Sequence, residues 1–142
     1  MVSQLRGARS RPSPNGGTAT ISHASIGVRE VEKAGKFYDA ALGALGYKRL
    51  YDSPEAVGYG AESPQLWLLK SAHPVPANAE SGLHFCFDAK TRGDVDSFHA
   101  AALKAGGKDN GKPGPRPDYG DNYYAAFVID PEGYRIEAYC GR

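Results

Sequence analysis

The chain has 142 residues, enough for one domain or for two small halves that share a core. Its 17 Lys and Arg residues nearly balance 16 Asp and Glu residues, which removes the electrostatic basis for a nucleic-acid-binding or polybasic membrane surface. No apolar run approaches the roughly 18 residues needed to cross a bilayer. Cys86 and Cys140 are too few for a disulfide framework and are predicted to be buried, reduced thiols. We therefore expect a cytoplasmic protein that handles a small molecule.

The first 20 residues differ in composition from the rest of the chain. They contain Arg6, Arg9 and Arg11, no acidic residue, and a cluster of Pro, Ser, Gly and Asn without periodicity. Such a segment buries too little apolar surface to offset the entropy lost on ordering. We predict disorder for residues 1–20, with an organelle transit peptide as the alternative, and a folded domain over residues 21–141.

Two copies of one pattern run through this domain, offset by 61 residues. A repeat of this size indicates two similar supersecondary units, neither of which buries its apolar face alone. We place the two modules at about residues 21–71 and 82–141. The identical pairs are His23 and His84, Phe37 and Phe98, Ala40-Ala41-Leu42 and Ala101-Ala102-Leu103, Ala44 and Ala105, and Gly46 and Gly107.

The first module is predicted to contain a strand, a helix and three further strands. Residues 21–28 alternate, with the larger apolar side chains on one face and His23 on the other. Residues 31–45 have apolar side chains at helical spacing, and Gly46 ends that pattern. Short strands are predicted at residues 47–51, 57–60 and 65–70, between turns that contain Pro and Gly.

The second module repeats the opening of this order. A strand over residues 83–89 has His84 and Cys86 on the face opposite two phenylalanines, and residues 94–105 have helical spacing. Residues 108–122 are rich in Gly and Pro and are predicted to form a loop that lines a site. The predicted strands at 123–130 and 134–140 are joined by the tight-turn sequence Asp130-Pro131-Glu132-Gly133.

The faces of these strands carry the main functional prediction. His23, His84 and Glu137 all lie on the face opposite the apolar side chains, which is the face that a helix does not cover. Two βαβββ modules related by pseudo-symmetry would turn these faces toward one another around a cavity. The expected fold is therefore α+β, with a curved mixed sheet. Two imidazoles and one carboxylate are the residue types of a 2-His-1-carboxylate metal site.

The chain resembles the vicinal oxygen chelate superfamily, also called the glyoxalase/bleomycin-resistance/dioxygenase fold. The resemblance covers about residues 21–141. It implies paired βαβββ modules, a divalent metal held by residues on strands, and substrates bound through two neighbouring oxygens. By position, His23, His84 and Glu137 match the family's ligands. The resemblance rests on His23 in ISHASIGV, Phe37-Tyr38 and Leu42-Gly43, His84 in GLHFCF, and the segment PGPRPDYGDNYYAAFVIDPEGYRIEAY.

One departure from the family pattern concerns a fourth metal ligand. The family's lactoylglutathione lyases take a glutamate from the last strand of the first module, where this chain has Leu66, Trp67 and Leu68. None of these binds a metal. A three-ligand site leaves more positions for substrate, dioxygen or water, which favours extradiol-dioxygenase or fosfomycin-type chemistry over a lactoylglutathione lyase. Imidazole and carboxylate accept Fe, Mn, Zn or Ni, so the sequence does not identify the metal.

Five other side chains are candidates for substrate binding: Trp67, Arg116, Tyr119, Tyr123 and Tyr124. Trp67 would form an apolar wall where the fourth ligand is missing, or belong to the core. Arg116 offers paired donors to a carboxylate or phosphate, or a hydrogen bond within its own loop. His73 is expected to be an exposed loop residue, and His99 a partly exposed surface residue.

We predict a metal-dependent lyase, isomerase or dioxygenase that acts on a small molecule with vicinal oxygens. Glu137 would be a metal ligand and, in isomerase-type chemistry, would also move a proton. The alternative is a metal-free protein that binds and sequesters a small molecule. The resemblance allows a site within one chain or across a dimer, and we expect a homodimer. The sequence does not identify the substrate.

Overall fold

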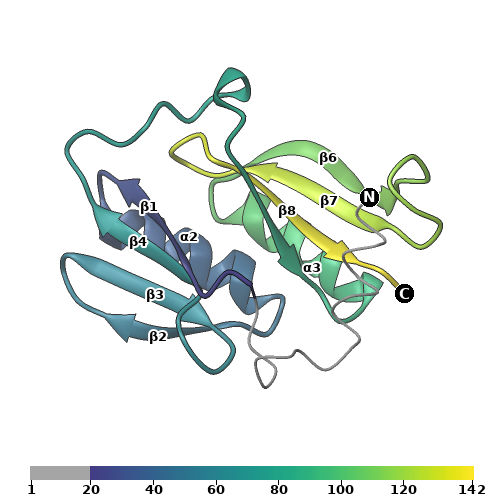
Figure 1. Ribbon diagram of the computed structural model, residues 1–142, viewed down its shortest axis with the longest axis horizontal. Coiled ribbons are helices and arrows are strands. Elements are labelled where there is room, and N and C mark those ends of the chain that lie inside the picture. Colours follow the sequence, from purple (N-terminus) through teal and green to yellow (C-terminus); the bar gives the residue numbers. More distant parts are fainter. Residues whose placement is uncertain (1–19) are drawn as a thin grey trace.

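The structure, a computed structural model, describes residues 20–142. The prediction of disorder for residues 1–20 lies outside the described residues, apart from Thr20. Two modules follow each other along the chain, each with a strand, a helix and three strands (Figure 1). The predicted pair of βαβββ modules and the α+β class are therefore confirmed.

The first module contains a four-stranded sheet and one helix. Its strands have the order β1-β4-β3-β2, with β1 parallel to β4 and the other pairs antiparallel. The helix has its apolar residues at helical spacing, so one side of it is buried against the sheet. The elements are β1 (Ala24–Val28), α2 (Val31–Gly43), β2 (Lys48–Asp52), β3 (Ala56–Gly60) and β4 (Leu66–Lys70).

The second module has the same topology, with strand order β5-β8-β7-β6 and β5 parallel to β8. A short 3-10 turn, η1 (Ala79–Ser81), lies in the connection between the modules. The side chain of Thr91 accepts a hydrogen bond from the backbone N–H of Asp94 and so caps the helix at its start. The elements are β5 (His84–Asp88), α3 (Arg92–Lys104), β6 (Lys108–Pro115), β7 (Tyr124–Ile129) and β8 (Arg135–Cys140).

Strand β6 corrects the prediction of a loop over residues 108–122. Residues Lys108–Pro115 pair antiparallel with β7, with shifts of register around Gly111 and Gly114. β6 is the last strand of its sheet, and an edge strand tolerates proline because one side of it needs no N–H donors. The Gly and Pro content therefore marked an irregular edge strand, and only residues 116–122 form the loop.

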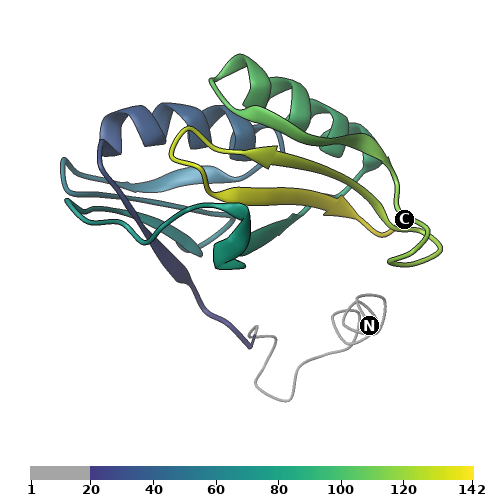
Figure 2. The same cartoon turned by 90° about the horizontal axis from the view of Figure 1, so that it is seen from above.

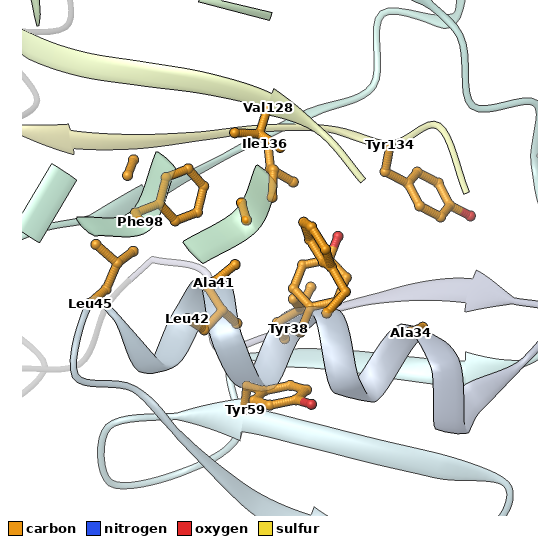
Figure 3. Packing of buried hydrophobic residues seen from close by; sticks show 14 of the residues in the cluster. Ala34, Tyr38, Ala41, Leu42, Leu45, Tyr59, Phe98, Val128, Tyr134 and Ile136 are labelled. Atoms are coloured by element: carbon orange, nitrogen blue, oxygen red, sulfur yellow. The ribbon is translucent and has the colours of Figure 1, made fainter. Parts of the chain in front are cut away.

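Both helices lie on the same side of the two sheets (Figure 2). They pack against each other, and one hydrophobic cluster runs through both modules (Figure 3). Phe37 from α2 and Phe98 from α3 both belong to this cluster, and each is at most 1% exposed. A Cβ atom at Gly107 would lie 2.8 Å from Phe37, so a glycine is needed where the modules meet. The opposite face of each sheet carries no helix, as the alternation of residues predicted.

The tight turn before β8 ties the second module to the first. Asp130 accepts a hydrogen bond from the hydroxyl of Tyr38 at 2.6 Å and from the backbone N–H of Tyr134 at 2.9 Å. The hydroxyl of Tyr134 donates to the carbonyl of Gly27 at 2.6 Å. Burial raises the pKa of Asp130, although the hydrogen bond from Tyr38 opposes this shift. These bonds fix how the two modules meet.

Two smaller predictions are wrong. His99 was expected on the surface, but it is 8% exposed and its Nε2 lies 2.9 Å from Oδ1 of Asp109. Asp109 belongs to β6, the strand that the sequence did not predict, so its cover of His99 could not be foreseen. Cys140 is buried as predicted, whereas Cys86 is exposed on the helix-free face of β5. Among the helices of residues 20–142, none is long and apolar enough to span a membrane.

Candidate functional site

The helix-free face of the second sheet brings together two of the predicted metal ligands. β5 and β8 are parallel neighbours in which Cys86 is the register partner of Glu137, so His84 lies diagonally across from Glu137 on the same face. Nε2 of His84 is 2.8 Å from Oε1 of Glu137. The Glu137 side chain is 5% exposed and that of His84 is 41% exposed. A buried carboxylate thus meets an imidazole that solvent and ligands can reach.

The second oxygen of this carboxylate is held by Tyr123. The Tyr123 hydroxyl donates to Oε2 of Glu137 at 2.5 Å. An ionised carboxylate only accepts hydrogen bonds, so Nε2 of His84 must be the donor to Oε1. A buried carboxylate needs such partners, because an unpaired buried charge costs several kcal/mol. The sequence predicted Tyr123 at the site but missed this contact. The sequence signal for this contact is the alternation that puts Tyr123, just before β7, on the same side as Phe127, the register partner of Glu137.

An aromatic ring and a guanidinium extend this face. Phe127 is the register partner of Glu137, and its ring centroid is 6.0 Å from that of His84. The Arg116 guanidinium lies 5.3 Å from the centroid of Phe127. Its nitrogens donate to the carbonyls of Lys112 at 2.6 Å and Gly114 at 2.9 Å. Arg116 therefore makes the loop hydrogen bonds that were one of its two predicted roles, and it lies against Phe127, the ring that also neighbours His84.

The three candidate tyrosines lie in two different environments. Tyr119 is 53% exposed and packs edge-on against Tyr123, with their centroids 5.3 Å apart. Tyr124 instead faces α3, where its hydroxyl donates to Asp96 at 2.7 Å and the Arg92 guanidinium lies 5.0 Å from its ring. The hydrogen bond to Asp96 raises the pKa of Tyr124. Tyr124 is thus separated from His84 and Glu137.

Trp67 occupies the position in the first sheet that Glu137 has in the second. Trp67 is the register partner of Ser25, and Glu137 is the register partner of Cys86. Ser25 and Cys86 are equivalent positions of the two modules, because they are separated by the repeat offset of 61 residues. A Cβ atom at Gly58 would be 3.0 Å from the indole, so Trp67 packs directly against that glycine. Tyr51 packs edge-on at 5.2 Å. The aromatic side chain of Trp67 therefore occupies the position at which the resemblance implies a fourth metal ligand in lactoylglutathione lyases.

His23, the third predicted ligand, lies apart from the other two. It is exposed just before β1, with Nδ1 in hydrogen-bond contact with the Ser22 hydroxyl at 3.0 Å. It lines a cavity of about 300 Å³ between the modules, together with Gln65 and Cys86. In the described part of the chain, residues 20–142, no three His, Cys, Asp or Glu side chains are grouped as a metal site.

Within one chain, the side chains of His84 and Glu137 therefore provide part of the donor atoms that a metal site requires. Imidazole nitrogen and carboxylate oxygen suit the divalent ions of the first transition series. A metal bound at Nε2 of His84 would replace the hydrogen bond between this nitrogen and Oε1 of Glu137. His84 and Glu137 supply two donors, and a third has to come from outside this pair.

Two βαβββ modules with an imidazole and a buried carboxylate on a helix-free sheet face define a class of two-module, small-molecule-handling proteins. The sequence matches the family model of the Glyoxalase/Bleomycin resistance protein/Dioxygenase superfamily over residues 20–138. The chain belongs to this superfamily, as the resemblance implied. Among curated proteins, no sequence matches the chain.

Solved structures of the same superfamily share the fold. A glyoxalase/bleomycin resistance protein from Albidiferax ferrireducens T118 is 30% identical with a TM-score of 0.72, and the match covers 86% of this chain and 98% of that chain. The fosfomycin resistance protein FosX from Mesorhizobium loti is 15% identical with a TM-score of 0.63, covering 88% and 94%. A lactoylglutathione lyase from Agrobacterium tumefaciens is 20% identical with a TM-score of 0.60, covering 87% and 95%. The last two likenesses concern the fold alone.

Proposed function

We propose that the protein is a metal-dependent enzyme that acts on a small molecule through two neighbouring oxygens, as a lyase, isomerase or dioxygenase. The observation that carries the proposal is the contact of His84 with the buried carboxylate of Glu137 on adjacent strands. A bound divalent ion supplies Lewis-acid polarisation of a substrate oxygen. His84 and Glu137 would supply two of the donors to that ion, and Glu137 could also carry a proton to or from a substrate atom within its reach. Phe127, whose ring centroid is 6.0 Å from that of His84, would form an apolar wall beside the bound substrate.

We further propose that the third donor is His23 of the partner subunit in a homodimer. Within one chain His23 lies apart from the pair, and the helix-free face of the first sheet carries aromatic and aliphatic side chains that solvent reaches. Tyr51 is 48% exposed and Leu69 is 40% exposed on that face. Contiguous exposed apolar groups mark surfaces that a partner covers. A second copy would cover them and bring a histidine to each His84–Glu137 pair.

Metal content and subunit mixing test this proposal. After reconstitution with Fe(II), Mn(II), Zn(II) or Ni(II), the wild type is expected to retain the matching metal in stoichiometric amount. His23→Ala, His84→Ala and Glu137→Ala should each abolish tight binding and leave the circular dichroism spectrum unchanged. If the triple variant keeps the wild-type metal content, the site assignment is wrong.

Mixing of two inactive variants separates a shared site from a single-chain site. Each dimer of His23→Ala with Glu137→Ala has one site that contains all three native donors, provided that the site is shared. An equal mixture that exchanges subunits should therefore recover about a quarter of the wild-type metal content. No recovery after confirmed exchange, or a monomer in sedimentation at micromolar concentration, would remove the shared site.

A metal-free binding protein is the second candidate, and one observation favours it. Both oxygens of Glu137 already have hydrogen-bond partners, Tyr123 and His84, within one chain, so this buried carboxylate needs no ion to satisfy it. Such a protein would bind and sequester a small molecule by its aromatic walls. A wild type that retains no metal after reconstitution, yet still dimerises, would support this candidate.

The aromatic wall at Trp67 leads to a prediction about reaction class. We expect little or no conversion of the methylglyoxal–glutathione adduct to lactoylglutathione, even with nickel or zinc supplied, because Trp67 replaces the fourth ligand and base. Trp67→Glu places a carboxylate opposite Ser25 and is expected to raise that activity above the wild-type level. Tyr51→Phe serves as the matched control, since it alters the same face without adding a ligand. Robust conversion by the wild type would restore the plain lyase assignment.

A further inference from the structure

The two oxygens of Glu137 have different environments. Oε1 faces the imidazole of His84 at 2.8 Å, whereas Oε2 receives the hydroxyl of Tyr123 at 2.5 Å. A hydrogen bond to an ionised carboxylate is roughly twice as strong as one between neutral groups. The carboxylate is therefore held at both ends, and only Oε1 is directed at the imidazole that solvent reaches.

Tyr123 is itself fixed in place. It is 6% exposed, and its ring stacks on Tyr139 with centroids 4.1 Å apart and planes inclined by 22°. Tyr119 covers another side of the ring edge-on. The carbonyl of Tyr123 accepts the N–H of Arg116 at 2.7 Å, which closes the loop between β6 and β7 at its base. The packing of two rings and the backbone hydrogen bond keep the Tyr123 hydroxyl in one position. Because Glu137 accepts a hydrogen bond from that hydroxyl, its carboxylate is held in one position as well.

We infer that Tyr123 is a positioning residue that occupies Oε2 of Glu137 and leaves Oε1 alone to act beside His84. The inference rests on the proposed function, in which Glu137 and His84 supply donors to a divalent ion. A carboxylate with both oxygens available can bind an ion through either oxygen or through both. Tyr123 restricts Glu137 to one oxygen and one orientation. This role differs from the substrate contact expected for Tyr123 from the sequence.

Tyr123→Phe tests the inference, because it keeps the stacked ring and deletes only the hydroxyl. Tyr119→Phe is the matched control, since it deletes a hydroxyl of the neighbouring, exposed ring. In nuclear magnetic resonance spectra of the metal-free protein at one neutral pH, the Nε2 proton of His84 is expected to exchange with solvent faster in Tyr123→Phe, because a carboxylate without the Tyr123 hydroxyl no longer keeps Oε1 directed at that proton. Tyr119→Phe should leave it unchanged. An unchanged exchange rate in Tyr123→Phe overturns the inference.

A second measurement uses Co²⁺ as a spectroscopic probe of the full-length protein. Loss of a group that orients a ligand typically weakens metal binding by about 10- to 100-fold. Tyr123→Phe should show that loss together with a changed visible absorption of the bound Co²⁺, because the freed Oε2 alters the number of donor oxygens. The same affinity and spectrum as the wild type would contradict a positioning role.

Two outcomes keep the inference separate from the proposed function. If the wild type binds no Co²⁺, the metal-dependent function fails, while the exchange of the His84 proton still decides the role of Tyr123. If Tyr123→Phe does not fold, the wild type alone decides it: a slowly exchanging hydroxyl proton of Tyr123 with a contact to Glu137 supports the inference. Rapid exchange of that proton overturns it.

Discussion

Replacing Asp130 with alanine is expected to destabilise the protein by about 3 kcal/mol or more, because each buried donor left without an acceptor costs roughly 1 to 3 kcal/mol. The variant leaves the buried hydroxyl of Tyr38 and the N–H groups of Glu132 and Tyr134 without their acceptor. Tyr38 is 0% exposed, so water cannot replace the lost bond. Urea unfolding followed by circular dichroism measures the change. An unfolding midpoint equal to that of the wild type would mean that this turn does not hold the modules together.

Asp130→Asn separates the hydrogen bonds from the charge. The amide oxygen keeps the role of Oδ1, so the loss should be smaller than for alanine. Burial raises the pKa of Asp130 above its ordinary value, which means that the folded state favours the protonated form. Its contribution to stability is then full below the ordinary pKa and is lost as the pH rises through the raised one. The wild type should therefore lose stability relative to Asp130→Asn as the pH rises from the ordinary carboxyl pKa of about 4 through the raised pKa. A constant difference across that range would contradict the raised pKa.

Phe98→Ala is expected to cost about 3 to 5 kcal/mol, the usual penalty for removing a fully buried aromatic ring. Phe98 is 0% exposed on α3 and belongs to the cluster that joins the two modules (Figure 3). Its loss leaves a cavity beside the helix contact and weakens both modules together. A single cooperative transition at lower urea concentration is expected.

Leu103→Ala is the matched control for Phe98→Ala. Leu103 lies on the same helix but is 36% exposed, so its truncation should cost clearly less. Equal losses in the two variants would show that the cluster does not join the modules. Two separate transitions in Phe98→Ala would show that the modules unfold independently.

Local patterns in the sequence were sufficient for the helices and for most of the strands. Helical spacing of apolar residues predicted α2 and α3, since the buried side of a helix recurs with its turn. Alternation predicted β1, β5, β7 and β8 for the same reason in a strand. β6 was missed because its Gly and Pro residues hide a strand that is held by its pairing with β7, and pairing between distant segments leaves no local period.

For the site, residue patterns were enough to predict the two modules, their superfamily resemblance, and the face on which His84 and Glu137 lie. The period of a strand is two residues, so the face of each side chain follows from its position along the strand. The contacts between side chains, by contrast, became visible only in the folded chain. The fold paired Glu137 with His84 and Tyr123, turned Tyr124 toward α3 and left His23 apart in its own chain. These contacts depend on the register between strands and on the packing of one module against the other, and neither is encoded within a single strand.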